Sequence, residues 1–315
     1  MAFFPRIAYY DKNDGDGHEN MTQHNKKTTD TDNSKAIRVS ASDLPGFIVR
    51  HCGNSRVVIS SPHSGRHYPD DFLHTSCRTW PELRQVEDGL LDILLLREPL
   101  DGVLIAAEFP RSFVDVNRHK DELDPKMFAS LPEGISTKES RYTRSGLGVI
   151  PSHIGQHMPI YDSLLTEQDY HRRIEGCYHP YHRQLAALLK TAQQHGSSVL
   201  LDIHSMPSDA SAKQTDIVIG DVHGQSAEPW LTHLAQDIFI KAGFDVRLNT
   251  PFAGGYITQH YGRPDQGISA IQIEINRRLY MDEKHIRLRP PWVEMSKTLE
   301  QLTQAVSKTL NHSNT

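Results

Sequence analysis

The sequence predicts an α/β fold with a largely parallel or mixed sheet and helices on both faces. Two observations favour this class. Strand-like and helix-like segments alternate along the chain, which is typical of sheets with crossover helices. Several strand-like runs are apolar without interruption, as expected for strands that are covered on both faces. Ligands of such sheets bind beyond the carboxyl ends of the strands, so functional residues should follow the strands.

The strand predictions rest on short runs rich in Val, Ile and Leu. Six segments qualify: residues 56–60, 102–107, 198–203, 215–220, 244–249 and 269–275. β-branched and aliphatic residues of this kind fit a buried pleated surface. These six segments are the expected strands of the central sheet.

The helix predictions rest on apolar residues at helical spacing and on end signals. Four segments qualify: residues 80–95, 178–196, 228–244 and 293–310. The first has Pro81 at a plausible first turn and continues through Leu83, Val86, Leu90 and Leu94. The second and third segments end at glycines, which favour the turn after a helix.

The domain prediction is a flexible N-terminal tail over residues 1–40 followed by one catalytic domain over residues 41–315. Residues 11–36 hold almost nothing apolar and cannot recover the entropy lost on ordering. No linker or internal repeat divides the remainder. A single domain of this size can bury a large core.

Composition excludes several classes of partner. The formal net charge of −5 gives no reason to expect nucleic acid or an anionic membrane as partner. No apolar run reaches the length of a membrane span, and the N-terminus lacks the pattern of a signal peptide. The 3 cysteines form no CxxC pair, which suits reduced thiols. We expect a soluble cytoplasmic protein whose oligomeric state the sequence leaves open.

Polar residues follow three of the predicted strands. His63 follows residues 56–60, the segment 111–118 follows residues 102–107, and His204 follows residues 198–203. Each His alone is more often a hydrogen-bonded turn residue, but two in similar positions favour a metal site. Zinc in hydrolases commonly takes two His and one carboxylate.

The third ligand is open at this point. The carboxylates of Glu87, Asp88 and Asp92 lie on the predicted helix over residues 80–95, where a solvated helix face is an equally good interpretation. Asp202, close to His204, is expected on the opposite face of its strand, in a supporting or structural role.

Glu274 is a carboxylate inside an apolar strand. Lying between Ile273 and Ile275, it should either pair with a cation such as Arg277 or Arg278, or have a raised pKa in a site. In both alternatives Glu274 has a role and is not a solvent-exposed surface residue.

Arginines complete the set of polar residues. Arg111, Arg118, Arg141 and Arg144 cluster in two segments, and several arginines near a metal indicate a small acidic substrate. Ordinary surface ion pairs remain the alternative for each. Residues 251–264 are too irregular for a helix or strand and suggest a ligand-binding loop or a tight turn.

Five motifs resemble the N-formylglutamate amidohydrolase family. They stand in the same order as in that family and span most of residues 45–285: "SPHSGRHYP", "FPRSFVDVNR", "LLDIHSMPS", "IVIGDVHGQS" and "TPFAGGYITQHYGRPDQGISAIQIEINRRLYMDE". The resemblance implies a three-layer phosphorylase/hydrolase-like fold that is distantly similar to zinc carboxypeptidases. It also implies hydrolysis of N-formyl-L-glutamate to formate and L-glutamate, a late step of bacterial histidine breakdown.

The resemblance also implies roles for individual residues. One Zn²⁺ per chain, or another divalent metal, would be bound by His63, Asp88 and His204, with Glu87 as the alternate to Asp88. Glu274 would be the base that activates water, and Arg111 would polarise the carbonyl. The substrate-binding residues would be Asn117 and Arg118 at the α-carboxylate, Arg144 at the side-chain carboxylate, and Tyr256 and His260 along the pocket.

Two other functions compete with this interpretation. The same zinc chemistry could act on another N-acyl amino acid or a short peptide. A non-catalytic binding protein could retain the fold, although the presence of His63, His204 and Glu274 favours an enzyme. His179 and His182 are interpreted as structural because Pro180 lies between them.

Overall fold

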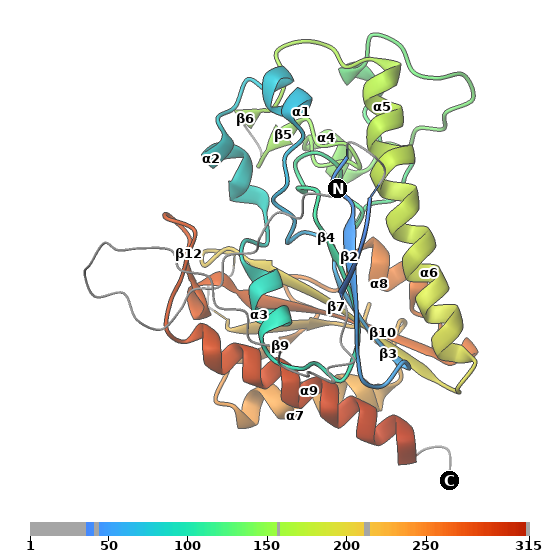
Figure 1. Ribbon diagram of the computed structural model, residues 1–315, viewed down its shortest axis with the longest axis vertical. Helices are drawn as coiled ribbons and strands as arrows, with labels where there is room; N and C mark the ends of the chain where they lie inside the picture. The colour runs from blue at the N-terminus through green and yellow to red at the C-terminus, as the bar shows by residue number, and fades with distance from the viewer. Residues whose placement is uncertain (1–35, 41–43, 156–157, 211–214, 313–315) are drawn as a thin grey trace, which may run out of the picture. The chain divides into compact units, whose positions relative to one another are not determined.

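An eight-stranded sheet forms the middle layer of the protein (Figure 1). The computed structural model describes residues 36–40, 44–155, 158–210 and 215–312. The strands lie in the order β1-β2-β4-β3-β7-β10-β8-β9. They are β1 (Ala36–Val39), β2 (Phe47–Cys52), β3 (Val57–Ser61), β4 (Gly102–Ala107), β7 (Ser198–Met206), β8 (Ile217–Gly220), β9 (Val246–Leu248) and β10 (Ile268–Asn276).

The sheet is mixed, with a parallel centre. Strands β4, β3, β7 and β10 run parallel to one another. At one edge β2 pairs antiparallel to β4, and at the other β8 pairs antiparallel to β10. The predicted α/β class is confirmed, and the carboxyl ends of β3, β4, β7 and β10 lie at one edge. His63 follows β3 there, whereas His204, expected after its strand, lies inside β7 near the carboxyl end.

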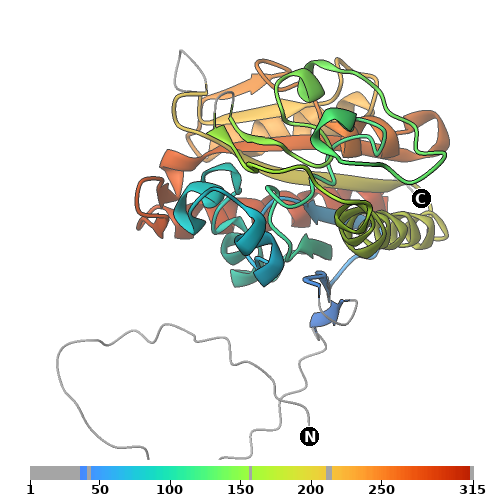
Figure 2. The same cartoon turned by 90° about the horizontal axis from the view of Figure 1, so that it is seen from above.

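Helices cover both faces of the sheet and make three layers, which can be followed from above in Figure 2. One face carries α5 (Glu167–Arg173), α6 (His179–Gln193) and α8 (Tyr256–Tyr261). The other carries α3 (Leu91–Arg97), α7 (Pro229–Lys241) and α9 (Trp292–His312). The predicted helices over residues 178–196, 228–244 and 293–310 are confirmed as α6, α7 and α9.

Shorter elements connect these layers. The short helices are α1 (Asp70–Thr75), α2 (Trp80–Leu83), α4 (Arg141–Arg144), four 3₁₀ turns (Arg84–Val86, Pro125–Met127, Pro264–Gln266 and Arg277–Leu279) and a π-helical turn (Ile174–Tyr178). Two hairpin-like pairs lie outside the main sheet: β5 (His153–Ile154) with β6 (Met158–Pro159), and β11 (Met281–Asp282) with β12 (Arg287–Leu288).

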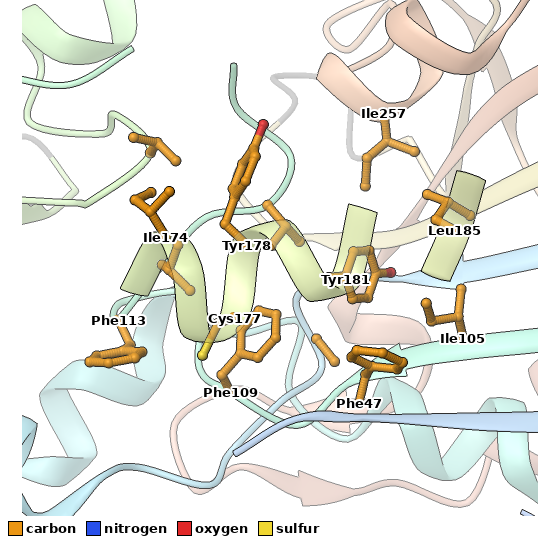
Figure 3. Close-up of a cluster of buried hydrophobic side chains, with 14 of the residues drawn as sticks. Phe47, Ile105, Phe109, Phe113, Ile174, Cys177, Tyr178, Tyr181, Leu185 and Ile257 are labelled. Atoms are coloured by element: carbon orange, nitrogen blue, oxygen red, sulfur yellow. The ribbon is translucent and has the colours of Figure 1, made fainter. Parts of the chain in front are cut away.

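Side-chain alternation along the strands sorts the core into two layers. On β7, Val199 and Leu201 pack into the core beneath α7 and α9, whereas Leu200 packs into the core beneath α6. Tyr181 and Leu185 of α6 point toward the sheet beside Phe47 of β2 and Ile105 of β4 (Figure 3). The ring of Tyr181 meets that of Phe47 edge-on at 5.9 Å between centroids.

This alternation corrects the expectation for Asp202. Residues two apart on a strand share a face, so Asp202 lies on the same side as His204. Its Oδ1 accepts a hydrogen bond from Ser60, whose hydroxyl in turn lies 3.1 Å from the hydroxyl of Tyr181 on α6. Asp202 is therefore beside the candidate metal ligand rather than behind the sheet.

The predicted helix over residues 80–95 is wrong as a continuous element. It is broken into α2, a 3₁₀ turn, an extended stretch from Glu87 and α3. Leu90 has a left-handed backbone with φ of 64°, and the backbone N–H of Asp88 donates to the carbonyl of His63 at 2.9 Å. That tertiary hydrogen bond replaces a helical one, and it moves Asp88 to the edge of the sheet.

Three further differences concern element boundaries. The predicted tail includes residues 36–40, yet residues 36–39 form edge strand β1 because their backbone pairs with β2; residues 1–35 lie outside the described residues. Neither β1 nor β2 was expected. Residues 251–264, expected to be irregular, contain the short helix α8.

Two findings concern membrane spans and disulfides. None of the helices within the described residues is long and apolar enough to cross a membrane. The three cysteines, all of which lie in the described part of the chain, form no disulfide.

Candidate active site

The turn after β3 places His63 at the carboxyl edge of the sheet. Gly65 makes this turn tight enough to lie against the chain that leaves β4. A Cβ atom at Gly65 would come 2.1 Å from the carbonyl oxygen of Phe109 and 2.5 Å from the carbonyl carbon of Glu108. Real side-chain atoms do not approach a backbone so closely, so only glycine fits here. The turn thereby holds His63, which is buried, against the segment that carries Asp115.

We expect Gly65→Ala to lower the free energy of unfolding by about 1–3 kcal/mol and to weaken metal binding, because the added methyl must push two backbone segments apart. Gly89→Ala is the matched control. It lies next to Asp88, but its added methyl first meets a side-chain atom at 3.4 Å. Chemical denaturation and metal titration of both variants measure the difference. Equal stability of the two would contradict the close-packing argument.

Three buried side chains converge behind this turn. His63, Asp88 and His204 each offer a ligand atom, and these atoms lie within 4.8 Å of one another. Asp88 Oδ2 is 3.1 Å from His204 Nδ1 and 3.7 Å from His63 Nδ1. Two imidazole nitrogens and one carboxylate oxygen form the donor set that zinc commonly takes in hydrolases.

A second carboxylate orients each imidazole. His63 Nε2 lies 2.7 Å from Asp115 Oδ1, and His204 Nε2 lies 3.0 Å from Asp202 Oδ2. Because a carboxylate only accepts, the Nε2 side of each ring is directed toward its carboxylate, and each Nδ1 is turned toward Asp88. His63 Nδ1 is buried with no hydrogen-bond partner among the described residues. A metal ion between His63 Nδ1 and Asp88 would give this unpartnered nitrogen a partner, so the residues fit a metal.

The structure separates the two carboxylates that compete for the third ligand position. Glu87 points away from the imidazoles, where its carboxylate accepts from Arg84 Nε at 3.1 Å and from the hydroxyl of Tyr68 at 2.5 Å. Asp92 pairs with Arg66 at 2.6 Å. Only Asp88 of these three reaches the cluster.

Arg277, which was not among the predicted site residues, holds Asp88 in place. Its Nη2 donates to the carbonyl of Glu87 at 2.6 Å and lies 3.5 Å from Asp88 Oδ1. The arginine therefore anchors the broken helix against the end of β10. Sequence spacing does not assign it, because a position three residues after Glu274 equally fits an ion pair with that carboxylate.

Glu274 lies across from His204 in the register between β10 and β7. Gln272 donates to its Oε1 at 2.7 Å, and no ion pair of Glu274 forms within the described residues. Burial, reinforced by the charge of Asp88, raises the pKa of Glu274 to about 7. Of the two alternatives for Glu274, the geometry matches a carboxyl group with a raised pKa in a site.

The segment after β4 surrounds the cluster with charges. Asp115 accepts from Arg111 Nε at 2.9 Å and from the backbone N–H of Asn117 at 2.8 Å, in addition to its contact with His63. Burial raises the pKa of Asp115, but Arg111 and His63 outweigh burial and hold that pKa well below its usual range. Asp115 thus ties the predicted substrate-binding segment to the candidate metal site.

Two side chains from the layer of α6 brace the same segment. Tyr178 donates to the carbonyl of Arg118, and His182 Nε2 lies 2.9 Å from the carbonyl of Val116. These contacts clamp the backbone on both sides of Asn117. His182 is therefore committed to a structural hydrogen bond.

These groups open into a cavity of about 450 Å³ at the carboxyl edge of the sheet. Such a volume lies in the range of small-molecule sites. The predicted residues that line it are His63, Arg111, Asn117, Arg118, His204 and Glu274. Two candidate metal ligands, a buried carboxyl group and arginines therefore share one cavity.

Three of the predicted substrate-binding residues do not line this cavity. The Arg144 side chain is 62% exposed and pairs with Glu139 at 3.2 Å. Tyr256 and His260 stack on each other at 5.0 Å on α8, outside the residues that line the cavity. Residues 251–255, which precede α8, line it instead. The glycine pair in that segment is the sequence signal, because a Cβ at Gly255 would come 2.4 Å from Asn117 Nδ2.

A buried pair of imidazoles and a carboxylate that could hold a metal ion, facing a second carboxyl group in a cavity at the ends of parallel strands, are typical of α/β hydrolases. Comparison with known proteins identifies the family. The family model for N-formylglutamate amidohydrolase matches residues 55–281, and the chain belongs to this family. The protein is accordingly an amidohydrolase.

Individual relatives agree with this assignment. The chain is 30% identical over 244 residues to N-formylglutamate deformylase of Pseudomonas putida, covering 74% of this chain and 84% of that protein. It is 28% identical over 243 residues to N-formylglutamate deformylase of Pseudomonas aeruginosa, with the same coverage. The crystal structure of N-formylglutamate amidohydrolase from Ralstonia eutropha JMP134 superposes with a TM-score of 0.80 and 32% identity, covering 86% of this chain and 100% of that chain.

Proposed function

We propose that the protein hydrolyses N-formyl-L-glutamate to formate and L-glutamate, with one zinc ion bound by His63, Asp88 and His204. The observation that carries the proposal is the convergence of two oriented imidazoles and Asp88 beside Glu274, in a cavity with several arginines. The names of the relatives supply the substrate. We propose that the reaction belongs to histidine degradation. We also propose that it takes place in the cytoplasm, because cysteines without disulfides are typical of that compartment.

A zinc ion at this position would supply Lewis acidity for the formyl carbonyl and the attacking water. The protein itself would orient the imidazole nitrogens that bind the metal. Asp115 and Asp202 lie against the outer nitrogens of His63 and His204, so both inner nitrogens face Asp88 and would be available to bind the metal.

Glu274 would serve as the general base. It would take a proton from the attacking water and pass it to the nitrogen of the breaking C–N bond, which leaves as the amine of L-glutamate. A carboxyl group with a pKa near 7 can both accept and return a proton at neutral pH. Arg111 would donate a hydrogen bond to the carbonyl oxygen, because its partly exposed side chain lines the cavity while Asp115 orients it.

Arg118 and Asn117 would bind the α-carboxylate. Burial lowers the pKa of Arg118, and its acidic neighbour Asp115 is 3.9 Å away, so its charge is only partly balanced. An anionic ligand would complete that balance. Asn117 is fixed by the backbone N–H of Ile257, which donates to its Oδ1 at 2.8 Å and leaves its amide nitrogen on the side of the site.

Formate release from N-formyl-L-glutamate tests the proposal. The purified protein is assayed as isolated, after removal of metal by a chelator, and after zinc is restored, with N-acetylglutamate and N-formylaspartate as comparison substrates. We expect activity that disappears with the metal, returns with zinc and prefers N-formylglutamate. If the protein bound stoichiometric metal but acted only on another acyl donor, its substrate would be a different N-acyl amino acid. Metal-independent activity, or none on any donor, would overturn the proposal.

A further inference from the structure

Four arginines line the cavity, and their charges are not balanced equally. Arg111 pairs with Asp115 at 2.9 Å, and Arg277 contacts Asp88 at 3.5 Å. Arg118 is partly balanced by Asp115 at 3.9 Å and donates to two backbone carbonyls. Arg141 forms no ion pair with the part of the chain that the structure describes, and its side-chain hydrogen bond is to the neutral hydroxyl of Tyr142, at 2.6 Å.

Tyr142 holds Arg141 beside Arg118. The guanidinium carbon of Arg118 lies 3.8 Å from the centre of the Tyr142 ring, and that of Arg141 lies 4.7 Å from the same centre. The Tyr142 carbonyl accepts from the backbone of Leu147, whose own carbonyl accepts from Arg118 Nε. One aromatic ring therefore positions a second cation next to the arginine assigned to the α-carboxylate.

We infer that Arg141, positioned by Tyr142, binds a second carboxylate on the substrate and selects N-formyl amino acids with an acidic side chain. This inference rests on the proposed function and adds the residue that determines specificity. In glutamate three carbon atoms separate the two carboxyl groups, so one arginine cannot serve both. Arg118 receives the group next to the amide, and Arg141, at the exposed side of the cavity, receives the distal group.

The inference moves this role from Arg144 to Arg141. Both arginines belong to α4, but Arg141 lines the cavity, whereas Arg144 is turned to solvent and paired with Glu139. The two side chains are thus a matched pair: equal in charge, one helical turn apart, and different in their access to the cavity.

The test compares two substrates of the same shape. Wild-type protein, Arg141→Gln, Arg141→Lys and Arg144→Gln, all loaded with zinc, are assayed with N-formyl-L-glutamate and with N-formyl-L-glutamine, which replaces the distal carboxylate by an amide. We expect Arg141→Gln to lower kcat/KM for N-formylglutamate roughly 10-fold, mainly through KM, and to leave N-formylglutamine nearly unchanged. Arg141→Lys should keep part of the preference, and Arg144→Gln should keep it all.

Several outcomes would overturn the inference. They are a wild type that treats the two substrates alike, an Arg141→Gln protein that loses both activities equally, and a loss of preference in Arg144→Gln instead. Each leaves the proposed function intact, because N-formylglutamate is still hydrolysed by the wild type. Failure of the wild type to hydrolyse N-formylglutamate is the distinct result that removes the proposed function and the inference with it.

Discussion

Glu274→Gln is expected to lower kcat for N-formylglutamate by about 10²- to 10⁴-fold while the metal stays bound, because the amide cannot accept the proton of the attacking water. The change keeps the size of the side chain and removes only the titratable group. Gln272, which donates to Glu274 Oε1, can donate in the same way to the amide oxygen. The strand and the neighbouring His204 should therefore keep their positions.

Steady-state kinetics and metal content, measured on the same preparation, decide the outcome. Glu274→Asp is the conservative variant: it retains the carboxyl group one methylene further from the site and should recover part of the lost rate. A Glu274→Gln protein with stoichiometric zinc and wild-type kcat would show that another group is the base. A variant that loses its zinc would be excluded from this comparison, and Glu274→Asp would then supply the decisive rate.

Asp88→Asn is expected to lower zinc affinity by more than about 100-fold. Removing a ligand should exceed the 10- to 100-fold loss that is typical when a group behind a ligand is removed. The anionic oxygen that faces both imidazoles is lost, and His63 Nδ1 and His204 Nδ1 are left as a two-nitrogen site. Competition with a chelator of known affinity measures the change.

Glu87→Gln is the matched control, since it makes the same chemical change at the adjacent residue. Its carboxylate contacts Tyr68 and Arg84 and not the imidazoles, so zinc affinity should stay near wild type. The free energy of unfolding should fall by about 1–3 kcal/mol, because the buried Arg84 contact loses its anionic partner. If Glu87→Gln lost zinc while Asp88→Asn kept it, the third ligand would be Glu87.

The pair Glu87 and Asp88 shows how far sequence reasoning reaches. Helical periodicity of Leu83, Val86, Leu90 and Leu94 predicted one helix, on which neither carboxylate could be preferred. The chain instead leaves the helical path at Glu87, because the N–H of Asp88 finds a better-placed acceptor in the carbonyl of His63. That acceptor is distant along the chain, so no local pattern could have shown it.

The arginines show the same limit from the other side. Their number near the predicted site indicated an acidic substrate. Which arginine of α4 faces the cavity depends on how this helix is turned. The position of Tyr142, whose ring contacts both Arg141 and the distant Arg118, also contributes. The residues alone left Arg141 and Arg144 equal, and the family resemblance pointed to Arg144, three residues from the arginine of α4 that lines the cavity.

What the sequence by itself determined is the α/β class, six of the eight strands of the sheet, three of the four predicted helices, and the position of His63 and His204 near the carboxyl ends of strands. These follow from local periodicity and from the rule that the ends of parallel strands share an edge. Only the tertiary structure decided which carboxylate lies at the candidate metal site, the setting of Glu274 and which arginine of α4 lines the cavity. Each of these depends on contacts between residues far apart in the chain, whose distances and burial no local pattern contains.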